Sequence, residues 1–168
     1  MTTAQSISLT DLQGVDIFTG LSNQNLEEIA ECCIQFVFRA GEYAAVQGKT
    51  TDHLLIVNGG KVTIETWIEV PRHSYTLTIT TLTKGRVCAW SALVPPHVLT
   101  ASVKCVEKTP MIAMLAKDLQ HILTAKPVLE ATVMRNLAGI ISSRLRDSHT
   151  QLTSLCTEVL KEGIRHRE

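Results

Sequence analysis

Residues 84–103 read KGRVCAWSALVPPHVLTASV and interrupt a series of short segments that are typical of β-strands. Ser91 is placed to cap a short helical turn, which Pro95 and Pro96 would end before strand-like sequence resumes at Leu99. A short helix between two strands of a barrel points its free N–H groups inward, where they can bind an anion. A loop that fills the barrel with Trp90 is the other interpretation, and the sequence leaves both open.

The segments around this stretch predict a β-rich region from Ile34 to about Leu115. Many short strands with regular Gly- and Asn-containing turns favour an antiparallel barrel or a double-sheet roll. The sequence Asn58-Gly59-Gly60 predicts a hairpin between two of these strands, because Asn and Gly tolerate the positive φ of primed turns. The predicted strand segments are 35–38, 53–57, 61–67, 75–82, 99–106 and 111–114.

Helices are predicted on both sides of this region. A short N-terminal helix follows Ser22, a candidate N-cap, and its apolar positions recur at steps of three and four. A long C-terminal helix begins near Pro127, because proline suits a first helical turn. We therefore divide the chain into a β-roll domain with its N-terminal helix, residues 1–126, and a C-terminal helical extension, residues 127–168.

The apolar stripe of the long helix extends beyond what one small barrel can cover. We predict that it pairs with a second copy of the chain, because closed two-fold dimers are the commonest oligomers. A helix that folds back on its own domain, broken near Asp147-Ser148, is the alternative. The predicted dimer face consists of Leu129, Val133, Leu137, Ile140, Ile141 and Leu145.

Composition excludes several classes of function. The 168 residues carry 16 Lys and Arg against 16 Asp and Glu, so bulk charge gives no reason to expect nucleic acid or an anionic membrane as partner. No signal sequence or membrane-length apolar stretch is seen, and we expect a cytoplasmic protein. The five cysteines and six histidines are scattered, without zinc-site spacing, HExxH, P-loop or G-x-S-x-G. We predict neither enzyme activity nor a metal.

Short motifs in a fixed order run along almost the whole chain. They include Gly20-Leu21-Ser22, Gly41-Glu42, Gln47-Gly48, Gly60, Gly85, Ala92-Leu93, Thr100-Ala101-Ser102-Val103, Pro127 and Arg144-Leu145. With these motifs the chain resembles the cyclic nucleotide-binding domains of catabolite-activator-type regulators and of cyclic-nucleotide-dependent kinase regulatory subunits. The resemblance implies a mostly β fold with flanking helices: an eight-stranded antiparallel jelly roll with a short N-terminal and a long C-terminal helix. It also implies a ligand inside the roll, whose presence the C-terminal helix reports.

The phosphate-binding cassette of that family departs from its pattern here. In the family a Glu accepts a hydrogen bond from the ribose hydroxyl and an Arg pairs with the cyclic phosphate. Trp90 and Leu99 occupy those two positions, and Ala89 replaces the family's Gly. A buried phosphate without its charged partner forfeits ~3–5 kcal/mol, so ordinary cyclic AMP binding is not expected. The predicted ligand-binding positions are Ala89, Trp90, Ser91, Ala92, Leu93, Leu99, Thr100 and Ala101, with Arg86 and His97 as candidate anion contacts.

These observations predict a non-catalytic sensory or regulatory module. It would bind a non-standard ligand or none, without a further cofactor, and signal through its C-terminal helix. One alternative is a genuine sensor of cyclic AMP or cyclic GMP that uses backbone donors, and another is a scaffold protein with a filled pocket. We expect a second copy as partner and a separate effector protein. Direct DNA binding is not expected, because the family's transcription regulators continue past the long helix into a winged helix-turn-helix, whereas this sequence ends at Arg165-His166-Arg167-Glu168.

Overall fold

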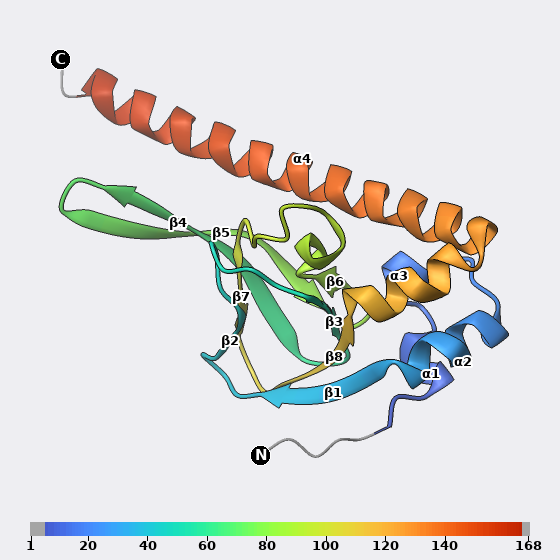
Figure 1. The fold of residues 1–168 in the computed structure, drawn as a ribbon. Coiled ribbons are helices and arrows are strands. Elements are labelled where there is room, and N and C mark those ends of the chain that lie inside the picture. Colours follow the sequence, from blue (N-terminus) through green and yellow to red (C-terminus); the bar gives the residue numbers. More distant parts are fainter. Residues whose placement is uncertain (1–5, 166–168) are drawn as a thin grey trace.

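Two four-stranded antiparallel sheets form the centre of the molecule, which a computed structural model describes from residue 6 to residue 165 (Figure 1). The strand orders are β1-β8-β3-β6 and β2-β7-β4-β5. The strands are β1 Cys33–Phe38, β2 Tyr43–Ala45, β3 His53–Val57, β4 Lys61–Val70, β5 His73–Thr83, β6 Val87–Cys88, β7 Ser102–Cys105 and β8 Thr109–Leu115. The predicted jelly roll is confirmed, although β2 and β6 are too short to leave an alternating pattern in the sequence.

Asn58-Gly59-Gly60 joins the two sheets and does not form the predicted hairpin. Strand β3 pairs with β6 and β8, whereas β4 pairs with β5 and β7. Gly60 has a φ of 70°, and a Cβ there would lie 2.8 Å from the Lys108 carbonyl oxygen. The hairpin prediction was wrong because a chain that crosses from one sheet to the other needs a glycine with positive φ, just as a tight turn does. The hairpin lies instead between β4 and β5, where Val70 is paired with His73.

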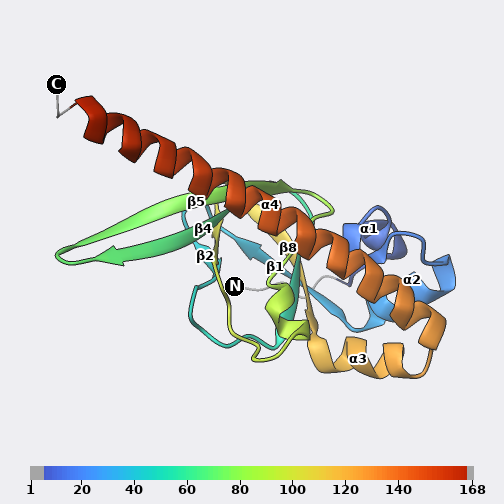
Figure 2. The ribbon, with the colours of Figure 1, turned by 90° about the horizontal axis from the view of Figure 1, so that it is seen from above.

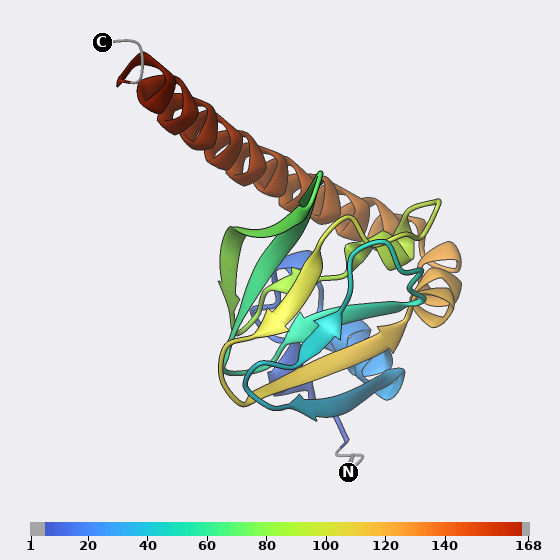
Figure 3. The same ribbon diagram turned by 90° about the vertical axis from the view of Figure 1, so that its left-hand side faces the viewer.

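The helices lie at one end of the roll and along one side of it. They are α1 Leu9–Leu12, the 3-10 turn η1 Asp16–Phe18, α2 Asn23–Glu31, α3 Ala116–Thr124 and α4 Pro127–Arg165. The predicted N-terminal helix is confirmed in α2, where the Ser22 hydroxyl accepts a hydrogen bond from the Asn25 amide at 3.3 Å. Helix α4 is continuous over 39 residues, through Gly139 and Asp147-Ser148. It crosses over the roll, and its C-terminal part projects on the side of the β4–β5 hairpin (Figures 2 and 3).

The sheet β1-β8-β3-β6 separates two apolar clusters. Successive side chains of a strand point to opposite faces, so Leu54 and Ile56 of β3 pack toward the helices, while Leu55 and Val57 pack inside the roll. Strand β8 alternates in the same way. The sheet therefore carries a helix-side core on one face and the interior of the roll on the other.

The first half of α4 belongs to the helix-side core. Leu129, Val133 and Leu137 are buried there, so these three residues do not form a dimer face, and that part of the prediction was wrong. Ile140 and Ile141 are partly buried against the same core, whereas Leu145 is 70% exposed. The helix thus folds back on its own domain over its first half, as the alternative held, but without a break. The predicted division at residue 126 coincides with the start of α4 but not with the edge of the core.

Asn136 connects this half of α4 to the N-terminal segment. Its side-chain amide donates hydrogen bonds to the carbonyl oxygens of Ile17, at 3.0 Å, and Thr19, at 2.9 Å. Lys126, immediately before the helix, bonds to Glu28 of α2. These polar contacts and the buried leucines together fix the direction in which α4 crosses the roll.

Candidate functional site

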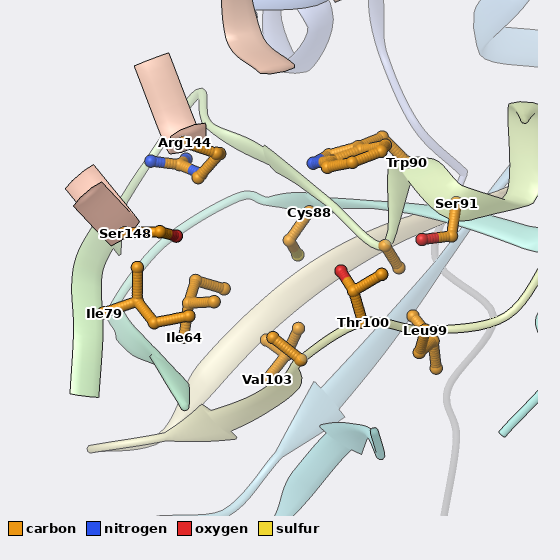
Figure 4. Close-up of a pocket in the computed structure, with 12 residues that line it drawn as sticks. Ile64, Ile79, Cys88, Trp90, Ser91, Leu99, Thr100, Val103, Arg144 and Ser148 are labelled. Carbon is orange, nitrogen blue, oxygen red and sulfur yellow. The ribbon is translucent and has the colours of Figure 1, made fainter. Parts of the chain in front are cut away.

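A cavity of about 80 Å³ lies inside the roll, beneath α4 (Figure 4). Its walls come from the sheet that contains β4, β5 and β7, from the segments 88–91 and 99–101, and from α4. The lining residues are Ile64, Ile79, Cys88, Ala89, Trp90, Ser91, Leu99, Thr100, Ala101, Val103, Arg144 and Ser148. Six of the eight predicted ligand-binding positions therefore meet around one space.

The other two positions, Ala92 and Leu93, belong to a short 3-10 turn, η2 Trp90–Leu93, and do not line the cavity. Trp90 and Ser91 line the cavity, whereas Ala92 and Leu93 lie in the helix-side core. The side chains of the four residues therefore do not all face the cavity, because one tight turn directs successive side chains to different sides. The N-cap is Ala89, in the left-handed conformation with φ 52°, and not the predicted Ser91.

Leu99 occupies the position at which the sequence resemblance implies an arginine. The backbone holds it firmly, because its amide donates to the Lys49 carbonyl at 2.9 Å and its carbonyl accepts from the Gly48 amide at 2.8 Å. The side chain is buried in the apolar cluster inside the roll. This wall of the cavity therefore presents hydrocarbon and not the cation that the resemblance implies.

Arg144 is the one charged side chain among the lining residues, all of which belong to the part of the chain that the structure describes. It comes from α4, is 17% exposed, and places Nη1 3.3 Å from Oδ2 of Asp147. Burial raises the pKa of the Cys88 thiol, which also lines the cavity, and the positive charge of Arg144 lowers it in part. Arg144 is not among the site residues that the sequence predicted, because helical spacing does not show which turn of α4 lies over the roll.

The two predicted anion contacts lie outside the cavity. Arg86 faces an outer groove, where its Nη1 is 3.8 Å from Oδ2 of Asp16. His97 faces a different hollow, and its Nδ1 lies 3.0 Å from the Ala92 carbonyl oxygen. Proximity in sequence to the cassette was misleading here, because the chain turns away from the cavity before and after the segment 88–91.

The size of the cavity limits what it holds in this conformation. Pockets for small organic ligands commonly measure ~300–1,000 Å³, and one buried water needs about 10–15 Å³. A cavity of about 80 Å³ therefore holds a few waters but not a nucleotide. Arg144 and Ser148 form the α4 side of this cavity.

Other chemistry is sparse in the described part of the chain. No group of three or more His, Cys, Asp or Glu side chains within residues 6–165 is arranged to hold a metal ion. His53 and Asp52 form a 2.6 Å contact, but neither residue lines the cavity. Burial raises the pKa of the Cys33 thiol to about 12, which keeps it protonated and unreactive near neutral pH. None of the described helices is both long and apolar enough to cross a membrane.

Neither a protein family model nor a curated protein sequence matches this chain, but solved structures do. A cyclic nucleotide-binding domain from Methylobacillus flagellatus kt matches with a TM-score of 0.76 and 16% identity, over 90% of this chain and 88% of that one. The Thermus thermophilus catabolite activator protein matches with a TM-score of 0.67 and 23% identity, over 84% of this chain and 63% of that one.

A third match is the regulatory subunit of a cAMP-independent protein kinase A from Trypanosoma brucei. Its TM-score is 0.68 and its identity 16%, over 88% of this chain and 50% of that one. A mutant of the same subunit, which matches equally well, is bound to cAMP in its A site. All three similarities lie below 25% identity, and together they identify the fold that the ordered sequence motifs predicted.

Proposed function

We propose that this chain, which has the fold of cyclic nucleotide-binding domains, is a non-catalytic regulatory module that signals through α4. The proposal rests on one observation: the segment 88–91 and α4 both contribute side chains to the wall of the inner cavity. Trp90 and Ser91 contribute the cassette side, and Arg144 and Ser148 contribute the α4 side. Any occupant of the cavity would therefore contact the helix that leads out of the domain.

The occupant that we propose is not a standard cyclic nucleotide. Trp90 and Leu99 replace both polar anchors of the cassette, and the loss of a charged partner costs a buried phosphate ~3–5 kcal/mol. Arg144 is the positively charged side chain that lines the cavity. It belongs to α4, the element that moves in the proposed mechanism, and not to the cassette. The broad face of Trp90 suits a flat, largely apolar ligand.

The mechanism that we propose is a change in the position of α4 between an occupied and an empty state. The helix-side core buries α4 up to Leu137 and contacts it up to Ile141, whereas Arg144 and Ser148 lie on the cavity about one to two turns beyond Ile141. A ligand that fits only after these residues move outward would favour the displaced helix. It shifts the equilibrium only by the difference between its affinities for the two states.

Titration with cyclic AMP, cyclic GMP and cyclic dinucleotides tests this proposal. A Trp67→Phe background isolates the emission of Trp90, because Trp67 lies on the β4–β5 hairpin and not in the cavity. We expect no saturable cyclic AMP signal at micromolar concentrations. The double variant Trp90→Glu with Leu99→Arg restores both anchors, and calorimetry should then show affinity for cyclic AMP higher by about 100-fold or more.

Each other outcome contradicts a definite part of the proposal. Micromolar binding of cyclic AMP or cyclic GMP by the unmodified chain would favour a genuine cyclic nucleotide sensor. If the restored variant keeps its circular dichroism spectrum and still binds nothing, the roll is a filled scaffold and the ligand is not part of its function.

The partner that we propose for the second half of α4 is another copy of the same helix. Leu145, Leu152 and Val159 recur every seven residues on its surface, and each is more than half exposed. A seven-residue apolar repeat is the spacing with which two helices pair in a coiled coil. We also propose that the module acts on a separate effector protein, does not contact DNA directly and is located in the cytoplasm.

A further inference from the structure

A second hollow, an open groove of about 490 Å³, lies outside the roll between α4, η1 and the residues that connect β5 to β6. Three arginines border it: Arg86 before β6, and Arg135 and Arg144 on α4. Asp16 of η1 is the one carboxylate among its lining residues. The groove is separate from the inner cavity, although Arg144 borders both.

The carboxylate in this groove is already occupied by contacts within the protein. Oδ1 of Asp16 accepts hydrogen bonds from the Ile17 amide at 2.9 Å and from the Val87 amide at 3.1 Å, while Oδ2 faces Arg86 at 3.8 Å. Burial raises the pKa of Asp16, although these amides and the charges of Arg86 and Arg144 lower it. Even when Asp147 is counted against Arg144, the three arginines leave the groove with excess positive charge.

The arginines differ in the polar contacts that their side chains make within the protein. Arg135 is exposed, and within residues 6–165 it has neither an ion pair nor a hydrogen bond. The Arg86 side chain is 60% exposed, and within the described residues its one polar contact is the 3.8 Å approach of Nη1 to Asp16. Gly139 faces the same groove, and a Cβ built on it would meet nothing within 4 Å, so the α4 wall is open between the arginines.

We propose that this groove binds the phosphate group of a small anionic molecule, with Arg86, Arg135 and Arg144 as its cationic contacts. A guanidinium presents planar, paired donors that match phosphate oxygens, and its weak hydration lowers the cost of binding. The hydroxyls of Thr81 and Ser143, which also border the groove, supply neutral donors. The volume lies within the range of about 300–1,000 Å³ that is common for small-molecule sites.

Binding at this place would connect α4 to the N-terminal segment and to β6 through one anion. It would also attract Arg144 toward the groove and away from the inner cavity, because one guanidinium cannot serve both fully. The inference itself does not rest on the proposed function of the inner cavity, since Arg86 and Arg135 border only the groove.

Calorimetry of the full chain with pyrophosphate, and with inorganic phosphate as the smaller probe, tests the site. Arg135→Gln should weaken pyrophosphate binding by about tenfold or more, because it removes a charge-assisted contact. The fold should be unaffected, because Arg135 is exposed and makes no hydrogen bond or ion pair within residues 6–165 that the change would remove. Arg146→Gln is the matched control: Arg146 is exposed on the same helix, donates to the Ser142 hydroxyl and does not border the groove.

A melting temperature that pyrophosphate raises in the unmodified chain and in Arg146→Gln, but less in Arg135→Gln, would support the site independently. Equal weakening by the two substitutions would overturn it and show general attraction to a basic helix. Absence of measurable heat and of any thermal shift with either probe would also overturn it. Binding of pyrophosphate but not of phosphate would assign the site to ligands with more than one phosphate group.

Discussion

The two halves of α4 have similar apolar sequences and opposite surroundings. Leu137, in the first half, is 4% exposed in the helix-side core, whereas Leu152, four turns later, is 58% exposed. Both residues fit the same helical period, and the helix is continuous between them. The comparison shows that an apolar stripe marks the face of a helix that tends to be covered, but not how far along the helix the domain itself supplies the cover.

Truncation of Leu137 should have the largest effect on stability. Leu137→Ala would leave a cavity in the helix-side core and lower the free energy of unfolding by about 2–5 kcal/mol. Urea denaturation at one fixed protein concentration measures this loss. A loss below about 1 kcal/mol would show that the first half of α4 is not an integral part of the core, contrary to the comparison.

Gly139 lies between the two halves of α4, and its substitution by alanine should raise the free energy of unfolding. Alanine favours an interior helical position over glycine by about 0.5–1 kcal/mol, and a Cβ at residue 139 would meet no neighbour. Gly139→Ala should therefore stabilise the protein by about that amount in the same denaturation experiment. Destabilisation would indicate that another chain or a displaced part of the domain approaches α4 closely at this point.

Leu152 should contribute least to the stability of the folded monomer. Leu152→Glu changes an exposed side chain, and its effect on unfolding of the monomer should lie within about 0.5 kcal/mol. The same change places a charge in the proposed helix pair, so sedimentation velocity should show a dimer for the unmodified chain and a monomer for the variant. An unmodified chain that sediments as a monomer at high micromolar concentration would contradict the dimer, as would an unchanged dimer in the variant.

Much of the fold followed from local patterns. The capping hydroxyl of Ser22 and the spacing of the apolar residues after it predicted α2, and Pro127 marked the start of α4. Strand segments were recognised where a β-rich run extended over four or more residues, but not in β2 and β6. Six of the eight cassette positions line the cavity, because the order of short motifs along the chain already indicated the family's roll.

The errors share a different physical origin. Asn58-Gly59-Gly60 has the conformation that a turn demands, but whether the chain then returns to the same sheet or crosses to the other depends on partners more than 40 residues away, in β8 and β7. Arg86 and His97 are close to the cassette in sequence and lie outside the cavity, whereas Arg144 is distant in sequence and lines it.

The amino-acid sequence alone determined the local conformations, the order of the elements and the presence of Trp90 and Leu99 where the resemblance implies charged side chains. These depend on the backbone preferences and chemical identity of residues that are neighbours along the chain. The direction of α4 across the roll, the burial of Leu137 and the meeting of Arg144 with Trp90 were settled only by tertiary packing. Periodicity shows which residues share a face of a helix, whereas the surface that covers this face is built from segments far apart in the sequence.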